Sequence, residues 1–177
     1  MARPAPSMDL KSCIRSVPDF PKPGIMFRDI TPLLKDPRGF AEAIRRMAAP
    51  YKKGDVDVVL GAESRGFIFG VAIAQKLGAG FVPIRKKGKL PWQVMGEDYA
   101  LEYGSATVAM HVDALKPGER VLLIDDLLAT GGTSAAAVAL VKKLGAQILE
   151  IGFLIELKFL NGREKLKGCP VRSIVVY

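Results

Sequence analysis

Two adjacent carboxylates, Asp125 and Asp126, precede a turn of small residues. Small side chains leave the main-chain N–H groups accessible, and glycine tolerates positive φ, so several N–H groups can converge at the start of the following helix. The turn consists of Ala129, Thr130, Gly131, Gly132 and Thr133. We expect such a turn to bind a phosphate group.

The two acids need a different ligand. A carboxylate about 4 Å from a phosphate is repelled by ~4 kcal/mol at an effective dielectric of about 20. The 2′,3′-diol of a ribose would offer hydrogen-bond donors to Asp125 and Asp126, and a metal ion could offset their charge. The segment therefore predicts a site for a phosphorylated sugar.

A buried strand and a helix flank this segment. Residues 121–124 form a continuous apolar run, typical of a strand buried on both faces of a parallel sheet. From Ser134 onward, alanines and aliphatic residues predict a helix that ends at Gly145. Ligands of open α/β sheets bind at the carboxyl ends of strands, where the two acids stand. An ordinary strand-to-helix turn is the alternative.

The chain is basic, with a formal charge of +8 and a pI near 9.6, which favours anionic ligands. Its densest basic cluster is Arg85, Lys86, Lys87 and Lys89. Nearby aromatic residues do not alternate with the basic ones as on an RNA-stacking surface, so nucleic acid is not expected as a partner. A pyrophosphate site explains the cluster better, and a solvated charged loop is the alternative.

Strands and helices alternate along the chain. Strands are predicted at 56–60, 80–84, 121–124, 148–157 and 171–176, helices at 9–15, 36–51, 67–77 and 134–145, and a hairpin within 96–112. This order predicts an α/β fold with a mainly parallel central sheet flanked by helices. A length of 177 residues with 49% hydrophobic content fits one domain, 1–177.

The sequence gives no sign of export or of a membrane anchor. No apolar run is long enough to span a bilayer, and the first residues lack the apolar core of a signal peptide. We therefore expect a cytoplasmic protein without membrane contact. Cys13 and Cys169 are far apart and lack C-x-x-C spacing, so neither a zinc site nor a disulfide framework is expected.

Several separate motifs point to one family. The stretch VLLIDDLLATGGT is similar to the phosphoribosyl pyrophosphate (PRPP) signature of type I phosphoribosyltransferases. Together with PDFPKPGIMFRDITPLLKDP, ESRGFIFG, IRKKGKLP and YALEYG, in that order, the chain resembles the adenine phosphoribosyltransferase family from about Ile14 to its end. The resemblance implies the type I fold, with an N-terminal base-binding hood at about residues 1–34 and a flexible catalytic loop.

The resemblance also implies a reaction and its sugar-phosphate site. Adenine and PRPP would give AMP and pyrophosphate in purine salvage, with Mg²⁺. Asp125 and Asp126 would hold the ribose hydroxyls, and residues 129–133 the 5′-phosphate.

A second set of residues is implied for the pyrophosphate. The family's pyrophosphate loop is matched by Glu63, Ser64, Arg65 and Gly66, and the 63–64 peptide bond is the candidate for a cis bond. Arg65 is a natural bidentate partner for phosphate oxygens, and an exposed surface charge is the alternative. The family's basic segment is matched by Arg85, Lys86 and Lys89.

The implied catalytic residues are Glu102, Arg65 and Tyr103. Glu102 lies in the stretch that matches the catalytic loop, where a carboxylate could take the imidazole proton of adenine as general base and return it in the reverse reaction. Tyr103 would shield the reacting ribose from water. A solvent-facing Glu on a hairpin is the alternative for Glu102.

Adenine would bind in the N-terminal segment. Met26, Phe27 and Arg28 match the family's base-binding segment, with Phe27 stacked on the purine and main-chain groups reading the amino edge. A 6-oxo purine presents the opposite donor pattern, so guanine and hypoxanthine should be poor substrates. An ordinary core aromatic is the alternative for Phe27.

Mg²⁺ would be held mostly by PRPP oxygens and water, so no metal site made by protein alone is expected. The resemblance implies a homodimer. Two other functions stay open: transfer to another purine base, and a PRPP-sensing regulator that binds nucleic acid through the basic surface.

Overall fold

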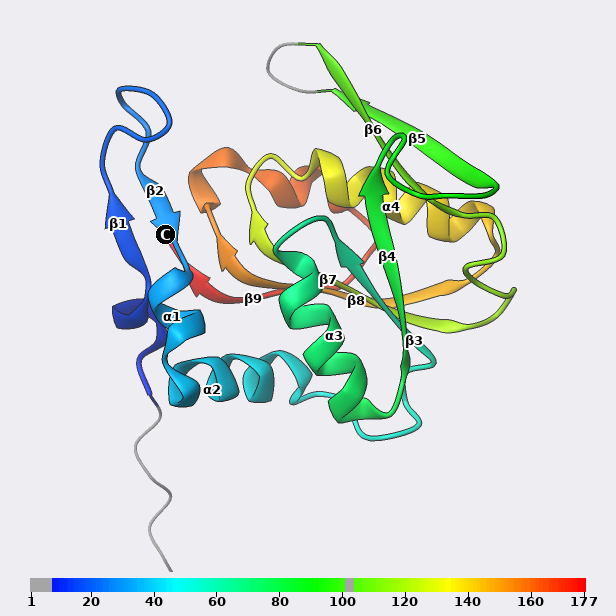
Figure 1. Ribbon diagram of the computed structural model, residues 1–177, viewed down its shortest axis with the longest axis horizontal. Coiled ribbons are helices and arrows are strands. Elements are labelled where there is room, and N and C mark those ends of the chain that lie inside the picture. Colours follow the sequence, from blue (N-terminus) through cyan, green and yellow to red (C-terminus); the bar gives the residue numbers. More distant parts are fainter. Residues whose placement is uncertain (1–7, 101–103) are drawn as a thin grey trace, which may run out of the picture. The chain divides into compact units, whose positions relative to one another are not determined.

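The computed structural model describes residues 8–100 and 104–177. The chain divides into two units, Met1–Arg46 and Met47–Tyr177, which are described in turn. Figure 1 labels helices and strands of both units. Glu102 and Tyr103 lie outside the described residues.

The first unit contains a small antiparallel ribbon. Strand β1 (Arg15–Val17) pairs with β2 (Phe27–Asp29), and a proline-rich turn joins them, as expected. The 3₁₀ helix η1 (Leu10–Cys13) precedes the ribbon, and Asp9 caps it by accepting a hydrogen bond from the Lys11 amide at 3.0 Å. The short helix predicted at 9–15 is therefore present in 3₁₀ form.

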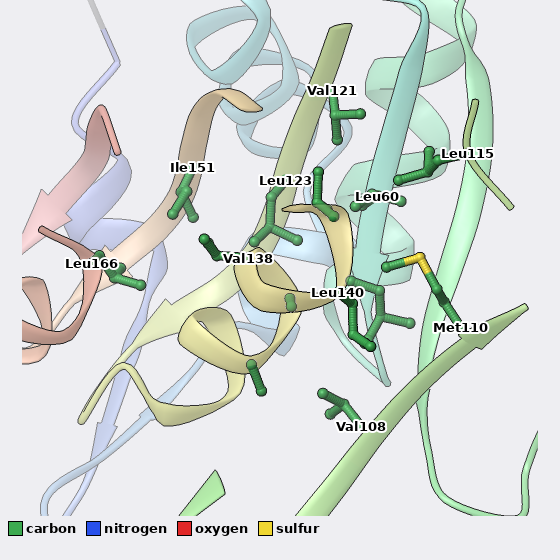
Figure 2. Packing of buried hydrophobic residues seen from close by; sticks show 14 of the residues in the cluster. Leu60, Val108, Met110, Leu115, Val121, Leu123, Val138, Leu140, Ile151 and Leu166 are labelled. Atoms are coloured by element: carbon green, nitrogen blue, oxygen red, sulfur yellow. The ribbon is translucent and has the colours of Figure 1, made fainter. Parts of the chain in front are cut away.

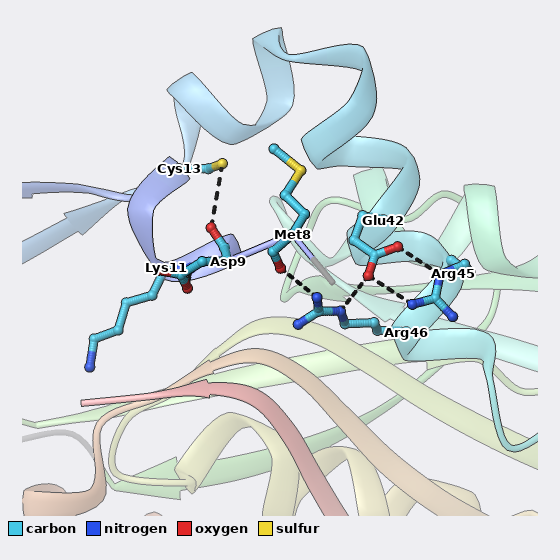
Figure 3. A network of polar contacts seen from close by, with 7 residues as sticks. All are labelled: Met8, Asp9, Lys11, Cys13, Glu42, Arg45 and Arg46. Carbon is cyan, nitrogen blue, oxygen red and sulfur yellow. Dashed lines mark hydrogen bonds and ion pairs between the residues drawn. The ribbon is translucent and has the colours of Figure 1, made fainter. Parts of the chain in front are cut away.

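Two helices follow the ribbon. Helix α1 (Thr31–Lys35) was not predicted, and it starts where the Asp29 carboxylate accepts hydrogen bonds from the amide and hydroxyl of Thr31 at 2.9 and 2.8 Å. Helix α2 (Pro37–Ala48) confirms the predicted helix, although it ends three residues early. On α2, Glu42 binds Arg45 and Arg46 at 2.6 Å each, and Arg46 donates to the Met8 carbonyl at 2.5 Å (Figure 3).

The second unit is built on a sheet of seven strands among the residues that the structure describes, in the order β5-β6-β4-β3-β7-β8-β9. Strands β3, β4, β7, β8 and β9 run parallel, while β5 and β6 form the predicted hairpin. The strands are β3 (Val58–Ala62), β4 (Gly80–Lys86), β5 (Val94–Ala100), β6 (Ser105–His111), β7 (Arg120–Leu128), β8 (Gln147–Glu156) and β9 (Val171–Val176). The predicted α/β class is confirmed.

Helices cover both faces of this sheet. Helix α4 (Gly132–Lys143) contributes Val138 and Leu140 to a buried cluster with Leu123 of β7 and Ile151 of β8 (Figure 2). Alternate strand residues point to opposite faces, so residues next to Leu123 face the other side, where α3 (Gly66–Leu77) packs on β3 and β7. Burial on both faces explains the continuous apolar strands. Two 3₁₀ helices, η2 (Lys158–Leu160) and η3 (Gly162–Leu166), follow β8.

Strand β7 is longer than its apolar run predicted. It continues through both acids to Leu128 because β8 pairs with it along this length, with Asp125 opposite Phe153 and Leu128 opposite Glu156. Asp125 and Asp126 therefore lie within the C-terminal part of β7 rather than after the strand. Among the described residues, no helix combines the length and apolar character needed to cross a membrane.

Candidate active site

The turn between β7 and α4 has free space for a small anion. Gly131 adopts φ +77° just before the helix, and the first helical hydrogen bond is donated by Ala135 to the Gly131 carbonyl at 2.9 Å. The preceding amides at the start of α4 have no acceptor within the helix. They border a cavity of about 70 Å³ lined by Asp125 and residues 127–134. The turn thus has the geometry expected of a phosphate site.

The two acids form a coupled pair. The Asp126 side chain is buried, Asp125 is half-buried, and the Asp126 amide donates to Asp125 Oδ1 at 2.8 Å. Burial, followed by the charge of Asp126, raises the pKa of Asp125 well above 3.8. Burial also raises the pKa of Asp126, against the opposing charge of Arg65. A ligand that brings donors or positive charge would therefore relieve an unfavourable pair.

Arg65 joins the acids to the loop after β3. Its Nε lies 2.7 Å from Asp126 Oδ2. Strands β3 and β7 are parallel neighbours, with Gly61 opposite Ile124, so both chain segments leave the sheet at one edge. A cavity of about 320 Å³ at this edge is lined by Glu63, Ser64, Arg65, Asp125, Asp126, Leu127 and Thr133. Residues expected to bind pyrophosphate, ribose and 5′-phosphate thus share one cavity.

Gly66 permits this close approach; the sequence placed Gly66 in the loop but did not predict this contact. A Cβ at this position would lie 2.9 Å from both Asp125 Oδ1 and the Ile124 carbonyl oxygen. Any side chain would push the start of α3 away from β7. A glycine at the first position of a helix that follows a ligand loop was the available signal.

Glu63 is engaged with the basic segment. Its carboxylate accepts from Arg85 Nε at 3.2 Å and from the Lys86 amide at 3.1 Å. These hydrogen bonds, with Arg85 contributing most, lower the pKa of Glu63. Arg85 also donates to the Lys89 carbonyl at 2.8 Å. The Glu63–Ser64 peptide bond is cis, as the resemblance implied.

Glu63 and Arg65 line the same cavity but have different ion-pair partners. Arg65 reaches the acids, whereas the Glu63 carboxylate fastens the loop to β4. The side chains of Lys86 and Lys89 are exposed.

The expected base-binding residues lie in the first unit. Phe27 belongs to β2, is half-buried, and meets Phe20 edge to face with ring centroids 5.1 Å apart. Met26 is exposed, and Arg28 donates to the Ser16 hydroxyl. The ribbon thus presents an aromatic ring and an exposed Met at its turn end, while the other predicted site residues belong to the second unit.

Strand β5 brings another residue, Tyr99, to the phosphate turn. The Tyr99 ring carbon Cδ2 lies 3.0 Å from where a Cβ on Gly132 would stand. Strand β5 ends one residue later, at Ala100, directly before the segment that contains Glu102. The sequence placed Tyr99 in the YALEYG motif but did not predict this contact, because contact between a hairpin and a helix start leaves no local pattern.

The donor set suits a hard cation only in part. Asp125 and Asp126 supply carboxylate oxygens, the ligand type that Mg²⁺ prefers. Within residues 8–100 and 104–177, however, no group of three or more His, Cys, Asp or Glu is placed to hold a metal ion. The residues present fit an ion that takes its remaining ligands from a bound substrate and water.

Comparisons with known proteins agree with this geometry. The family model described as phosphoribosyl transferase domain matches residues 29–173. The chain is 54% identical over 170 residues to an adenine phosphoribosyltransferase of Thermotoga neapolitana, covering 96% of this chain and 100% of that protein.

Solved structures are similar as well. Adenine phosphoribosyltransferase from Rhodothermus marinus superposes with a TM-score of 0.90 at 50% identity, covering 95% of this chain and 96% of that one. The enzyme of Trypanosoma brucei, in complex with AMP, pyrophosphate and ribose 5-phosphate, has a TM-score of 0.87 at 26% identity and covers 94% and 77%.

Proposed function

The chain belongs to the adenine phosphoribosyltransferase family, a group of glycosyltransferases with the type I fold, and we propose that it makes AMP and pyrophosphate from adenine and PRPP in purine salvage. One observation of the structure carries this proposal most directly. The acidic pair, the small-residue turn and Arg65 line two cavities that share Asp125, Leu127 and Thr133, and Arg65 contacts Asp126 directly.

We assign the sugar end of PRPP to β7 and its turn. The amides and hydroxyls of Ala129, Thr130, Gly131, Gly132 and Thr133 hold the 5′-phosphate at the positive end of α4. Asp125 and Asp126 accept hydrogen bonds from the ribose 2′- and 3′-hydroxyls. Their negative charge also favours the positive charge that develops on the ribose as pyrophosphate leaves.

We assign the pyrophosphate to the loop after β3. Arg65 and Ser64 line the cavity beside the acids and donate to phosphate oxygens. Glu63 acts by holding Arg85, and Arg85, Lys86 and Lys89 supply positive charge next to the loop. Arg65 counts as catalytic because it contacts the leaving group as negative charge accumulates there.

Adenine and its proton are assigned to two other segments. Phe27 stacks on the purine, and main-chain groups of Met26 and Arg28 recognise its amino edge. Glu102 accepts the imidazole proton as the bond to ribose forms, and Tyr103 excludes water from the ribose.

Magnesium belongs to this proposal as a cofactor. When bound, Mg²⁺ would supply positive charge that offsets the charge of the pyrophosphate. Asp125 and Asp126 are the carboxylates of the site that would help to hold it. A homodimer, a cytoplasmic location and a single phosphoribosyltransferase domain over residues 1–177 complete the proposal, supported by the near full-length match to relatives.

A product assay tests the function. Purified protein is incubated with PRPP, Mg²⁺ and either adenine, hypoxanthine or guanine, and nucleotide products are separated by chromatography. We expect AMP from adenine and little product from the 6-oxo bases. Equal or better turnover of another purine would favour that base as substrate. PRPP binding without any product, together with salt-sensitive binding of nucleic acid, would favour a regulator instead.

A further inference from the structure

The start of η3, at Gly162, contacts the phosphate turn on the side away from its cavity. Given the proposed function, we propose that Gly162 is a positioning residue for the 5′-phosphate, because its main chain packs against the main chain of the turn. Gly162 is buried at the start of η3, and it is not among the residues that line the cavity of the turn.

The contact leaves no room for a side chain on either side. A Cβ on Gly162 would overlap the Ala129 carbonyl oxygen, and it would also lie 2.8 Å from Leu128 Cδ1. A Cβ on Gly131 would overlap the Gly162 carbonyl oxygen. Gly162 does not adopt a positive φ, so space and not backbone conformation is what requires glycine there. The two segments therefore touch backbone to backbone.

This contact orients the amides of the turn. Among the atoms around a Cβ on Gly162, the Ala129 carbonyl oxygen is the nearest, so that carbonyl is turned toward Gly162. In a trans peptide the C=O and the following N–H point in opposite directions. The Thr130 N–H is accordingly directed away from Gly162. Packing against the carbonyl side of the turn thus presents the donor side to an anion.

Hydrogen bonds on both sides fix the supporting segment. The Leu157 amide donates to the Leu128 carbonyl at 2.9 Å, which joins the end of β8 to the end of β7. Asn161, directly before Gly162, adopts φ +52°, and its amide donates to the Lys158 carbonyl at 3.1 Å. Asn is one of the few residues with a side chain that tolerate this conformation.

An ion pair holds the segment from the other side. Arg163 binds the buried Glu156 carboxylate with Nε and Nη2, each at 2.7 Å, and donates to the Val171 carbonyl at 2.9 Å. The segment that contacts the turn is thus tied to both β8 and β9. A larger side chain at Gly162 should therefore displace the phosphate turn, because the segment that contains Gly162 is held by β8 and β9.

Ligand binding tests the proposal. Calorimetric titration would compare ribose 5-phosphate with pyrophosphate on Gly162→Ala, on the unsubstituted protein, and on Gly80→Ala, whose Cβ would make only ordinary contacts beyond 3.5 Å. We expect Gly162→Ala to raise the dissociation constant of ribose 5-phosphate about tenfold or more, while that of pyrophosphate changes less than about twofold. Gly80→Ala should bind both as the unsubstituted protein does. Unchanged ribose 5-phosphate binding, or an equal loss of both ligands, would overturn the positioning role.

A second pair of variants covers the case in which Gly162→Ala does not fold. Asn161→Val places a β-branched residue at φ +52°, whereas Asn161→Gly keeps the conformation at little cost. We expect only the Val variant to lose ribose 5-phosphate affinity, and identical affinities would contradict the proposal. Failure of the unsubstituted protein to bind ribose 5-phosphate or to make AMP would instead count against the proposed function.

Discussion

Arg65 Nε lies 2.7 Å from Asp126 Oδ2, so the residue assigned to pyrophosphate is paired with one assigned to ribose. The Arg65 side chain is 39% exposed, whereas that of Asp126 is only 9% exposed. The guanidinium therefore has one side toward solvent, from which phosphate oxygens can approach without breaking the pair first. Binding of the pyrophosphate and of the ribose should therefore be coupled through this contact.

Arg65→Met should weaken the binding of pyrophosphate and of PRPP. Hydrogen bonds to charged groups contribute about 1.5–3 kcal/mol, so the dissociation constant of pyrophosphate should rise roughly 10- to 150-fold. Titration calorimetry measures it, with exposed Arg38→Met as the charge-matched control. Equal affinities in Arg65→Met and Arg38→Met would remove Arg65 from the pyrophosphate site.

Asp125→Asn should stabilise the fold while weakening the binding of PRPP. Burial and the neighbouring Asp126 charge raise the pKa of Asp125, so its ionised form is unfavourable in the folded protein. A neutral isostere removes that cost, and the free energy of unfolding at pH 7 should increase by about 1–3 kcal/mol. Urea denaturation and PRPP titration measure the two effects.

The stabilisation should depend on pH in a defined direction. The pKa of Asp125 in the folded protein lies above its unfolded value of about 3.8, so below that pH Asp125 is protonated in both the folded and the unfolded protein. There, Asp125→Asn should not change the free energy of unfolding. The gain should appear as pH rises above about 4 and level off above the folded-state pKa. A gain that is constant down to pH 3, or stronger PRPP binding by the variant, would contradict this account.

Glu102→Ala should lower turnover without weakening the binding of PRPP. General base catalysis contributes about 10²- to 10⁴-fold, so kcat should fall by a factor in this range while the PRPP dissociation constant stays the same. Steady-state kinetics and PRPP titration separate the two quantities. Glu97→Gln, on β5 of the same hairpin, is the control and should retain activity. A Glu102→Ala enzyme with full turnover would exclude the general-base role.

Asp57 provides a pH-dependent test of stability away from the site. Its carboxylate binds Arg120 at 2.7 Å, which lowers the pKa of Asp57 to about 2 and joins the starts of β3 and β7. A lowered folded-state pKa gives stability above the unfolded pKa that is lost as pH falls toward about 2. Asp57→Asn should therefore lower the urea midpoint at pH 6 and make little difference at pH 2. Exposed Asp113→Asn is the control, and a deficit independent of pH would contradict the ion-pair explanation.

The local pattern of the sequence was sufficient for most elements. The strand predicted at 171–176 is β9, and the predicted hairpin is β5 with β6. Apolar runs, alternation and glycines at turns each report on their own neighbourhood, which is why these predictions succeeded. Helix α1 was missed because Pro32 and the short length conceal a helix whose start is fixed by Asp29.

Long-range pairing decided what the local pattern left open. Strand β7 extends through the acids because β8 continues beside it, and that partner is distant in the sequence. Glu63 lines the cavity with Ser64 and Arg65, but the sequence did not predict that its carboxylate binds Arg85 of the next strand. Gly66, Tyr99 and Gly162 act through close approaches to residues that no sequence window contains together with them.

By itself, the sequence determined the chemistry: a paired acid, a small-residue turn that can present amides, and an arginine loop, each at the end of a predicted strand. Their order and their types follow from residue identity and short-range conformational preference. Only the tertiary structure decided that Arg65 pairs with Asp126, and that Gly162 contacts the back of the turn. These relations depend on parallel strand pairing and on the space between packed backbones, which arise only when distant segments meet.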